Sequence, residues 1–205
     1  MKNVTLRQRI LVSFLAILAI MTLMVVVDYR RLLHVEAEAQ MINDDAVPGI
    51  YYSTSIRASW FAGFVVVQDA FNAPTEADRR VALEALPRND QQLEEHIEFY
   101  RRTISRQDDQ QMFDAFQKEL QEYKRIRTEI LSPAVAADAA RAQARIVSEL
   151  RPSFYRGRDV LARMVSENKK QADDAAVSIQ QSVEAAETGM LVSLVMAIAA
   201  SIVCG

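Results

Sequence analysis

The feature that most constrains this chain is an uncharged apolar stretch near its N-terminus, residues 10–27 (ILVSFLAILAIMTLMVVV). As an α-helix it would reach about 27 Å, close to the thickness of the hydrocarbon core of a bilayer. A cleaved signal peptide is the alternative, because the basic residues of segment 1–9 precede the stretch. However, the stretch is long for a signal core, and an A-x-A site occurs only at residues 37–39. We therefore expect an uncleaved transmembrane helix over residues 10–27.

A second apolar run closes the sequence, and residues 189–205 contain no charge. The run predicts a second membrane helix, although it is slightly short for a full span and no basic residue follows it. We therefore expect the chain to be cut inside or just after this helix. The basic residues of segment 1–9 favour a cytoplasmic N-terminus, which places residues 28–188 outside the cytoplasm.

The composition points to helices and argues against several classes of function. Only five Gly and five Pro occur in 205 residues, which favours an all-α fold. A net charge of −3 gives no support for nucleic-acid binding. The only cysteine, Cys204, excludes an intrachain disulfide, and His34 and His96 stand in no metal-binding motif. No catalytic constellation, metal site or cofactor site is expected, so we do not expect an enzyme.

The periodicity of the apolar residues predicts four long helices between the two membrane runs. Helix-breaking residues and capping patterns separate them. Their lengths are compatible with an all-α, up-down-up-down antiparallel four-helix bundle flanked by two transmembrane helices. The first helix continues from the membrane to Asn72 with a kink at Pro48, and the second runs from about Thr75 to Thr103 with a break at Pro87. A third helix opens at Ser105, and a fourth opens near Asp138.

Three polar features refine this bundle. Thr75 with Asp78, and Ser105 with Asp108, match the spacing of an N-terminal capping box. Asp90 is the one polar residue on the seam of the second helix, where it either faces solvent or fixes the register.

Several segments resemble bacterial methyl-accepting chemotaxis proteins. They are the opening MKNVTLRQRI with Tyr29-Arg30-Arg31-Leu32, Asp44-x-x-x-Pro48-Gly49-Ile50, Tyr100-x-x-x-Ile104, Phe116-x-x-x-Leu120-x-x-Tyr123 and residues 161–172. The resemblance implies a periplasmic four-helix-bundle sensor domain in the bacterial inner membrane that works as a homodimer. It also implies a HAMP linker and a cytoplasmic signalling domain after residue 205. The same bundle occurs on histidine kinases and nucleotide cyclases, and a ligand-free, membrane-tethered helical spacer is a further alternative.

An aromatic and arginine-rich belt is the candidate ligand site. Counting sixteen residues down from the distal turns near Ala73 and Asp138 places Arg57 and Phe154 at one level of the bundle. Arginine offers a planar fork for carboxylate or phosphate, so a small anionic ligand is expected. The candidate ligand-binding residues are Arg57, Tyr52, Trp60, Arg151, Phe154, Tyr155 and Arg158.

Each candidate in this belt also has a structural interpretation. The belt also contains Phe61 and Arg156. Trp60 and Phe61 lie on or beside the apolar stripe of the first helix and suit the core, while Arg156 and Arg158 suit surface ion pairs. The resemblance implies that arginines of the first helix bind ligand with groups of the fourth helix across the dimer interface, where Arg57 matches one of them. The further arginines of the aspartate and serine receptors are missing, so those two ligands are not expected.

A ligand bound to the first and last bundle helices would affect the membrane helices that continue from them. The first and last bundle helices continue into the two predicted membrane helices, and packed helices have discrete arrangements. We therefore expect a ligand to bias a small helix displacement across the membrane.

Overall fold

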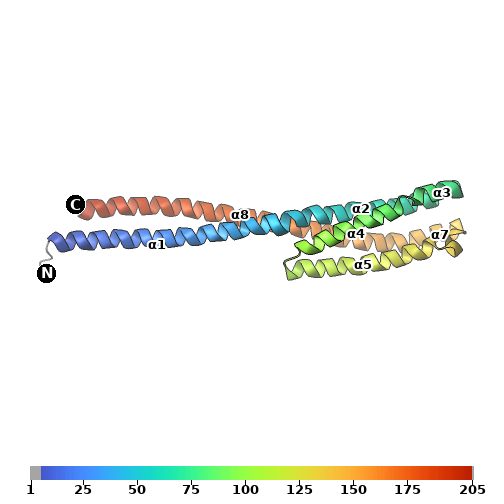
Figure 1. The fold of residues 1–205 in the computed structure, drawn as a ribbon, viewed down its shortest axis with the longest axis horizontal. Helices are drawn as coiled ribbons and strands as arrows, with labels where there is room; N and C mark the ends of the chain where they lie inside the picture. The colour runs from blue at the N-terminus through green and yellow to red at the C-terminus, as the bar shows by residue number, and fades with distance from the viewer. Residues whose placement is uncertain (1–5, 205) are drawn as a thin grey trace. The chain divides into compact units, whose positions relative to one another are not determined.

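A computed structural model describes residues 6–204, which contain no strand (Figure 1). Residues 1–5 of the predicted cytoplasmic segment 1–9, and Gly205 at the end of the predicted second membrane helix, lie outside the described residues. The helices, two of them π-helical turns marked η, are α1 (Leu6–Met41), η1 (Ile42–Ala46), α2 (Val47–Asn72), α3 (Glu76–Leu83), α4 (Leu86–Thr103), α5 (Gln107–Leu131), α6 (Pro133–Ala136), α7 (Ala139–Arg145), η2 (Ile146–Leu150) and α8 (Arg151–Cys204).

The chain divides into two compact units. One unit contains residues 1–42 and 173–205, and the other contains residues 43–172. The second unit is a four-helix bundle whose walls are α2, α3 with α4, α5, and α7 with η2 and the first part of α8. The outer parts of the predicted sensor domain, residues 28–42 and 173–188, belong to the first unit.

The apolar positions that step by three and four residues along α2 form its buried face, as the periodicity predicts. They meet equivalent positions on the other walls, so one apolar core runs through the bundle. Its largest fully buried apolar members are Trp60, Tyr100, Phe116, Phe154, Ile56, Ile130, Ile146, Leu150, Leu161, Met164 and Val67.

Trp60 is the centre of an aromatic cluster that joins three of the four walls. Its indole Nε1 donates a hydrogen bond to the backbone oxygen of Phe154 at 3.2 Å. Its ring lies 4.5 Å from that of Tyr123, and Phe64 stacks on Phe154 with ring centroids 4.2 Å apart. The approach is close because residue 157 is glycine: a Cβ there would stand 2.5 Å from Trp60 Cζ2.

Two helices have a side-chain cap at their start, one where a capping pattern predicts it and one near the predicted start of the fourth helix. The Thr75 hydroxyl accepts a hydrogen bond from the backbone N–H of Asp78 at 3.1 Å and so caps α3. The Asp138 carboxylate accepts one from the backbone N–H of Arg141 at 3.0 Å and caps α7. Each side chain satisfies one of the free N–H groups at a helix start.

The predicted capping box at Ser105 is wrong. The N-cap of α5 is Arg106, and no side chain caps it. The Ser105 hydroxyl donates instead to the carboxylate of Asp45, sixty residues away in sequence. A buried carboxylate needs such a donor more than an exposed helix start does, because water satisfies the helix start.

The helices predicted around Pro48 and Pro87 are each interrupted just before the proline. The predicted first helix is interrupted at η1, where the α-helical hydrogen bonds give way to a π turn, and α2 follows with Pro48 in its first turn. The predicted second helix is interrupted between Leu83 and Leu86, and α4 follows with Pro87 in its first turn. Proline is tolerated in the first turn of a helix, where its missing N–H group has no helical partner.

Asp90 fixes the register between α4 and α5. Its two carboxylate oxygens accept hydrogen bonds from Arg127 Nη1 and Nη2 at 2.8 and 2.6 Å. Arg127 is buried, so the fork geometry of this pair holds the two helices at one level.

The first unit consists of α1 and residues 173–204 of α8, which run antiparallel side by side (Figure 1). Arg31 Nη1 donates to the backbone oxygen of Ala185 at 2.9 Å, and His34 Nε2 lies 3.0 Å from the Ser178 hydroxyl oxygen. Within residues 6–204, no helix meets the combined length and hydropathy that a membrane span requires.

Candidate functional site

A groove of about 710 Å³ lies on the bundle surface between α2 and α8. Both helices present small side chains there, which lets the groove form. Its polar groups are two guanidinium groups, one carboxylate and one hydroxyl. The lining residues are Thr54, Arg57, Ala58, Phe61, Ala62, Arg158, Asp159 and Ala162.

Arg57 is the free cation of this groove. Its side chain is exposed, and it makes no hydrogen bond or ion pair with any of residues 6–204. Arg158, across the groove, is engaged: its Nε and Nη2 donate to Asp159 Oδ1 at 3.0 and 2.8 Å. The Arg158 guanidinium also lies 4.6 Å from the centre of the Tyr155 ring. An incoming anion therefore finds one unpaired guanidinium and a second one already oriented.

The other predicted site residues are divided between the core and the bundle surface. Trp60 and Phe154 are each 2 % exposed and belong to the core, so they support the groove from below. Tyr155 is half-exposed beside Arg158. Tyr52 stacks on Phe99 of α4 with ring centroids 5.3 Å apart and does not line the groove.

Arg151 is half-buried one to two turns before the groove residues of α8 and does not line the groove. Like Arg57, it has no hydrogen bond or ion pair within the described residues. The structure therefore brings Arg57 and Arg158 together and leaves Arg151 apart from them.

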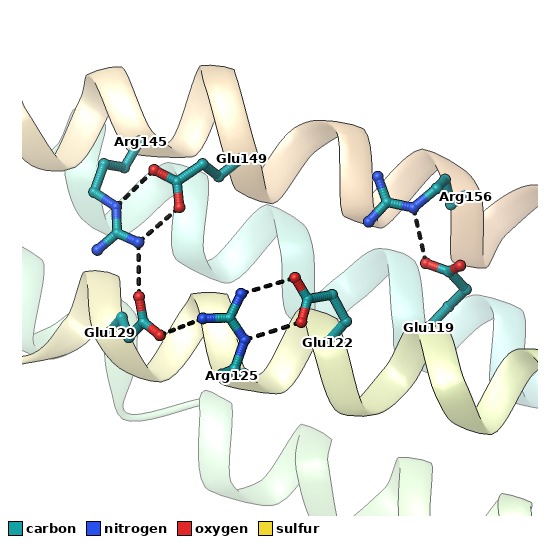
Figure 2. Close-up of polar contacts among 7 residues, drawn as sticks. All are labelled: Glu119, Glu122, Arg125, Glu129, Arg145, Glu149 and Arg156. Atoms are coloured by element: carbon teal, nitrogen blue, oxygen red, sulfur yellow. Dashed lines mark hydrogen bonds and ion pairs between the residues drawn. The ribbon is translucent and has the colours of Figure 1, made fainter.

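Arg125, Arg145 and Arg156 take part in ion pairs within α5 and between α5 and the α7–η2–α8 wall, which Figure 2 shows. Arg145 Nη2 contacts Glu129 at 2.7 Å and Glu149 at 2.6 Å, and Arg125 contacts Glu129 at 2.6 Å and Glu122 at 2.8 Å. Arg156 Nε donates to Glu119 at 2.9 Å. Arg156 is thus a surface ion-pair residue, as one interpretation of the sequence has it.

These ion pairs change how the carboxylates titrate. Hydrogen bonds from Arg125 lower the pKa of Glu122, and those from Arg145 lower the pKa of Glu129 and Glu149. These groups are solvent-exposed, so the ion pairs contribute little to the stability of the bundle and are screened by salt.

Sequence reasoning placed Arg57, Arg158 and Phe61 in the belt but missed the other groove-lining residues, and its preference for Phe61 in the core is wrong, because Phe61 is exposed. A signal was present on α2. Residues 47, 51, 54, 58 and 61 alternate steps of four and three, a heptad pattern opposite the core stripe, and all five are exposed. The heptad face comprises Val47, Tyr51, Thr54, Ala58 and Phe61, and three of its members line the groove.

Comparison with known protein families gives one finding. Residues 3–183 match the model of a family described as "Four helix bundle sensory module for signal transduction". No curated protein and no solved structure shows a significant match. The match covers most of the chain and agrees with the helical bundle of residues 43–172. The chain therefore belongs to the family of four-helix-bundle sensory modules of methyl-accepting chemotaxis proteins.

Proposed function

We propose that this chain is the sensor region of a membrane chemoreceptor, in which a small anionic ligand binds at the α2–α8 groove of a homodimer. Binding biases a displacement of α8 relative to α2, and this displacement reaches a cytoplasmic signalling domain after residue 205. The observation that carries the proposal is the unpaired Arg57 guanidinium in a groove whose other cation, Arg158, is already oriented by Asp159.

The heptad face of α2 supports the homodimer. Its five residues are uncharged, and exposed apolar side chains at heptad spacing pack well against an identical face. A symmetric dimer through this face would place a second copy of α2 beside the groove. The groove would then be partly enclosed, as a pocket for a small ligand requires.

Membrane placement rests on two segments. We infer that residues 10–27 and 189–205 are the anchors of a multi-pass protein in the bacterial inner membrane, with residues 28–188 in the periplasm. Large apolar side chains point outward along both segments, as lipid-facing helices require. They include Phe14, Leu18, Leu23, Val25, Leu191 and Val195.

Arg57→Ala is expected to abolish most of the ligand response. We would purify the 205-residue chain in detergent and screen it by thermal shift against amino acids, organic acids and phosphorylated metabolites. Loss of a charge-assisted hydrogen bond removes about 1.5–3 kcal/mol of binding free energy, so the affinity for the compound that stabilises the wild type should fall about 10- to 100-fold. Arg156→Ala is the matched control, because Arg156 already pairs with Glu119. Equal affinity of the wild type and Arg57→Ala would remove Arg57 from the site.

Phe61→Asp is expected to convert the dimer to a monomer, because it places two charges in an apolar seam. Sedimentation equilibrium of the detergent-solubilised chain measures the change. Val81→Asp is the control: Val81 is also an exposed apolar residue, 65 % accessible, but it lies on α3 away from the heptad face. A Phe61→Asp chain that dimerises as well as the wild type would contradict the proposed interface.

The output domain decides between a chemoreceptor and the alternatives of a histidine kinase or nucleotide cyclase. Reading the gene beyond residue 205 settles this point. A long glutamate- and glutamine-rich hairpin supports the chemoreceptor, whereas an ATP-binding domain contradicts it. A folded chain that responds to no compound in the screen would favour the ligand-free spacer.

A further inference from the structure

A polar cluster, buried apart from the exposed Ser105, lies where all four walls of the bundle meet the α4–α5 turn. The Ser105 hydroxyl donates to Asp45 of η1, and the Tyr100 hydroxyl of α4 donates to Asp109 Oδ1 of α5. Asn168 of α8 donates from Nδ2 to the Tyr100 hydroxyl at 3.0 Å. These five residues, the proximal cluster, join every wall of the bundle through polar contacts.

Three oxygen atoms of the proximal cluster are buried without a hydrogen-bond partner among the described residues. They are Asp45 Oδ1, Asp109 Oδ2 and Asn168 Oδ1, and their residues are 5 %, 1 % and 0 % exposed. All three atoms are acceptors when the carboxyls are ionised. A proton on one carboxyl turns an acceptor into a donor and removes one of two buried charges.

The five residues of the cluster include no cation that compensates these charges. Arg106 is a base whose charge acts on Asp109, but it is exposed and already paired with Asp108 and, at 3.8 Å, with Glu167 of α8. Burial, followed by the charges of Asp45 and Asp108, raises the pKa of Asp109, against the opposing effects of the Tyr100 hydrogen bond and Arg106.

The cluster is attached to a π-helical turn. Asp45 lies in η1, and a π turn interrupts the regular ladder of a helix and often marks a functional position. One turn further, Asn168 packs against the backbone of α2, since a Cβ on Gly49 would stand 2.0 Å from Asn168 Oδ1. A change of charge in the cluster therefore acts on the start of α2, on the α4–α5 turn and on α8 at once.

We propose that the proximal cluster, made of Asp45, Tyr100, Ser105, Asp109 and Asn168, is a proton-binding site: Asp109 takes up a proton as the pH falls, and protonation tightens the packing of η1 against the α4–α5 turn and α8. The site is separate from the α2–α8 groove and needs no ligand there. It would make the conformation of the sensor respond to external pH.

The sign of the effect follows from the raised pKa. Between the pKa of Asp109 in the folded chain and 3.8, the unfolded chain is deprotonated and the folded chain holds the proton, so the folded state gains stability as the pH falls. Above the folded pKa this gain is lost. Each pH unit inside the window changes the folding equilibrium by about tenfold for one proton.

The test compares urea unfolding of the 205-residue chain with that of Asp109→Asn over a pH series from about 7.5 down to about 4. Asparagine imitates the neutral acid, because its oxygen accepts from Tyr100 while its NH₂ group donates. Asp109→Asn should be more stable than the wild type at the higher pH, and the difference should shrink at the lower pH. Asp114→Asn, on the exposed face of the same helix, is the matched control and should follow the wild type. Parallel pH profiles of the wild type and Asp109→Asn, or a less stable Asp109→Asn at the higher pH, would overturn the proposal.

Two further measurements keep the test decisive if Asp109→Asn fails to fold. The infrared band of protonated carboxyls in the wild-type chain should contain a component from Asp109, and Asp45→Asn should shift the titration of this component to lower pH while the exposed carboxyls titrate as before. Hydrogen–deuterium protection factors of residues 42–49 should rise as the band appears. A carboxyl titration that Asp45→Asn does not shift, or protection that is independent of pH, contradicts the proposal.

Discussion

Trp60→Ala should lower the free energy of unfolding by about 3–5 kcal/mol, because it removes the largest side chain of the core and leaves a cavity. The ring contacts aromatic residues of α5 and α8, so a collapse on one wall cannot fill the space. The loss is a large fraction of the roughly 5–15 kcal/mol that stabilises a typical domain. Urea unfolding should be followed by far-UV circular dichroism, since Trp60 is the only tryptophan and fluorescence is lost with it.

Phe61→Ala is the matched control for this prediction. Phe61 is the next residue in the sequence and is also aromatic, but it is 57 % exposed on the heptad face. Measured at a dilution at which the chain is monomeric, so that the proposed dimer contact of Phe61 does not contribute, its truncation should change the free energy of unfolding by less than about 1 kcal/mol. Similar losses in the two variants would show that the two positions do not divide into core and surface in this way.

The contrast between these neighbours shows what periodicity predicts well. The stripe through Ile56, Trp60, Phe64 and Val67 steps by four, four and three residues, and all four are buried. The all-α bundle and the capped starts of α3 and α7 follow from equally local patterns. Local signals suffice because each depends only on residues within about one helical turn of one another.

Pairing between helices is harder to predict, because it depends on the level at which two helices meet. Asp90 stands out as a polar seam residue, but its partner Arg127 follows only from the packing of α4 on α5. Ser105 has the local pattern of a cap, yet a buried carboxylate from another wall binds its hydroxyl.

The candidate site was also hard to predict, because it depends on the level at which α2 and α8 meet. Counting from the distal turns pairs Arg57 with Phe154, whereas Phe154 meets Trp60 and Arg57 shares its groove with Arg158. The displacement amounts to about one helical turn. The fourth wall begins with a short α7 and the π turn η2, which use more residues for the same height than a straight α-helix does.

Gly157→Val should destabilise the bundle by about 3 kcal/mol, although glycine itself disfavours a helix. Replacing a glycine inside a helix by a residue with a Cβ gains up to about 1 kcal/mol of helix propensity. Overpacking a core costs about 1–3 kcal/mol and more where the neighbour cannot move. Here the neighbour is the rigid indole of Trp60, with Cζ2 2.5 Å and Cε2 3.0 Å from the new Cβ. The steric effect therefore exceeds the gain in propensity, and urea unfolding measures the net loss.

A double-mutant cycle separates this steric cause from a general intolerance of α8 to substitution. Trp60→Ala removes the ring that the new side chain strikes, and the methyl groups introduced by Gly157→Val then fill part of the cavity. The double variant should therefore be more stable than the sum of the two single losses predicts, by at least about 1 kcal/mol. Additive losses would mean that Gly157 and Trp60 are not in contact. A favourable coupling would establish that glycine is needed at this position because the only tryptophan of the chain packs directly against the backbone of α8.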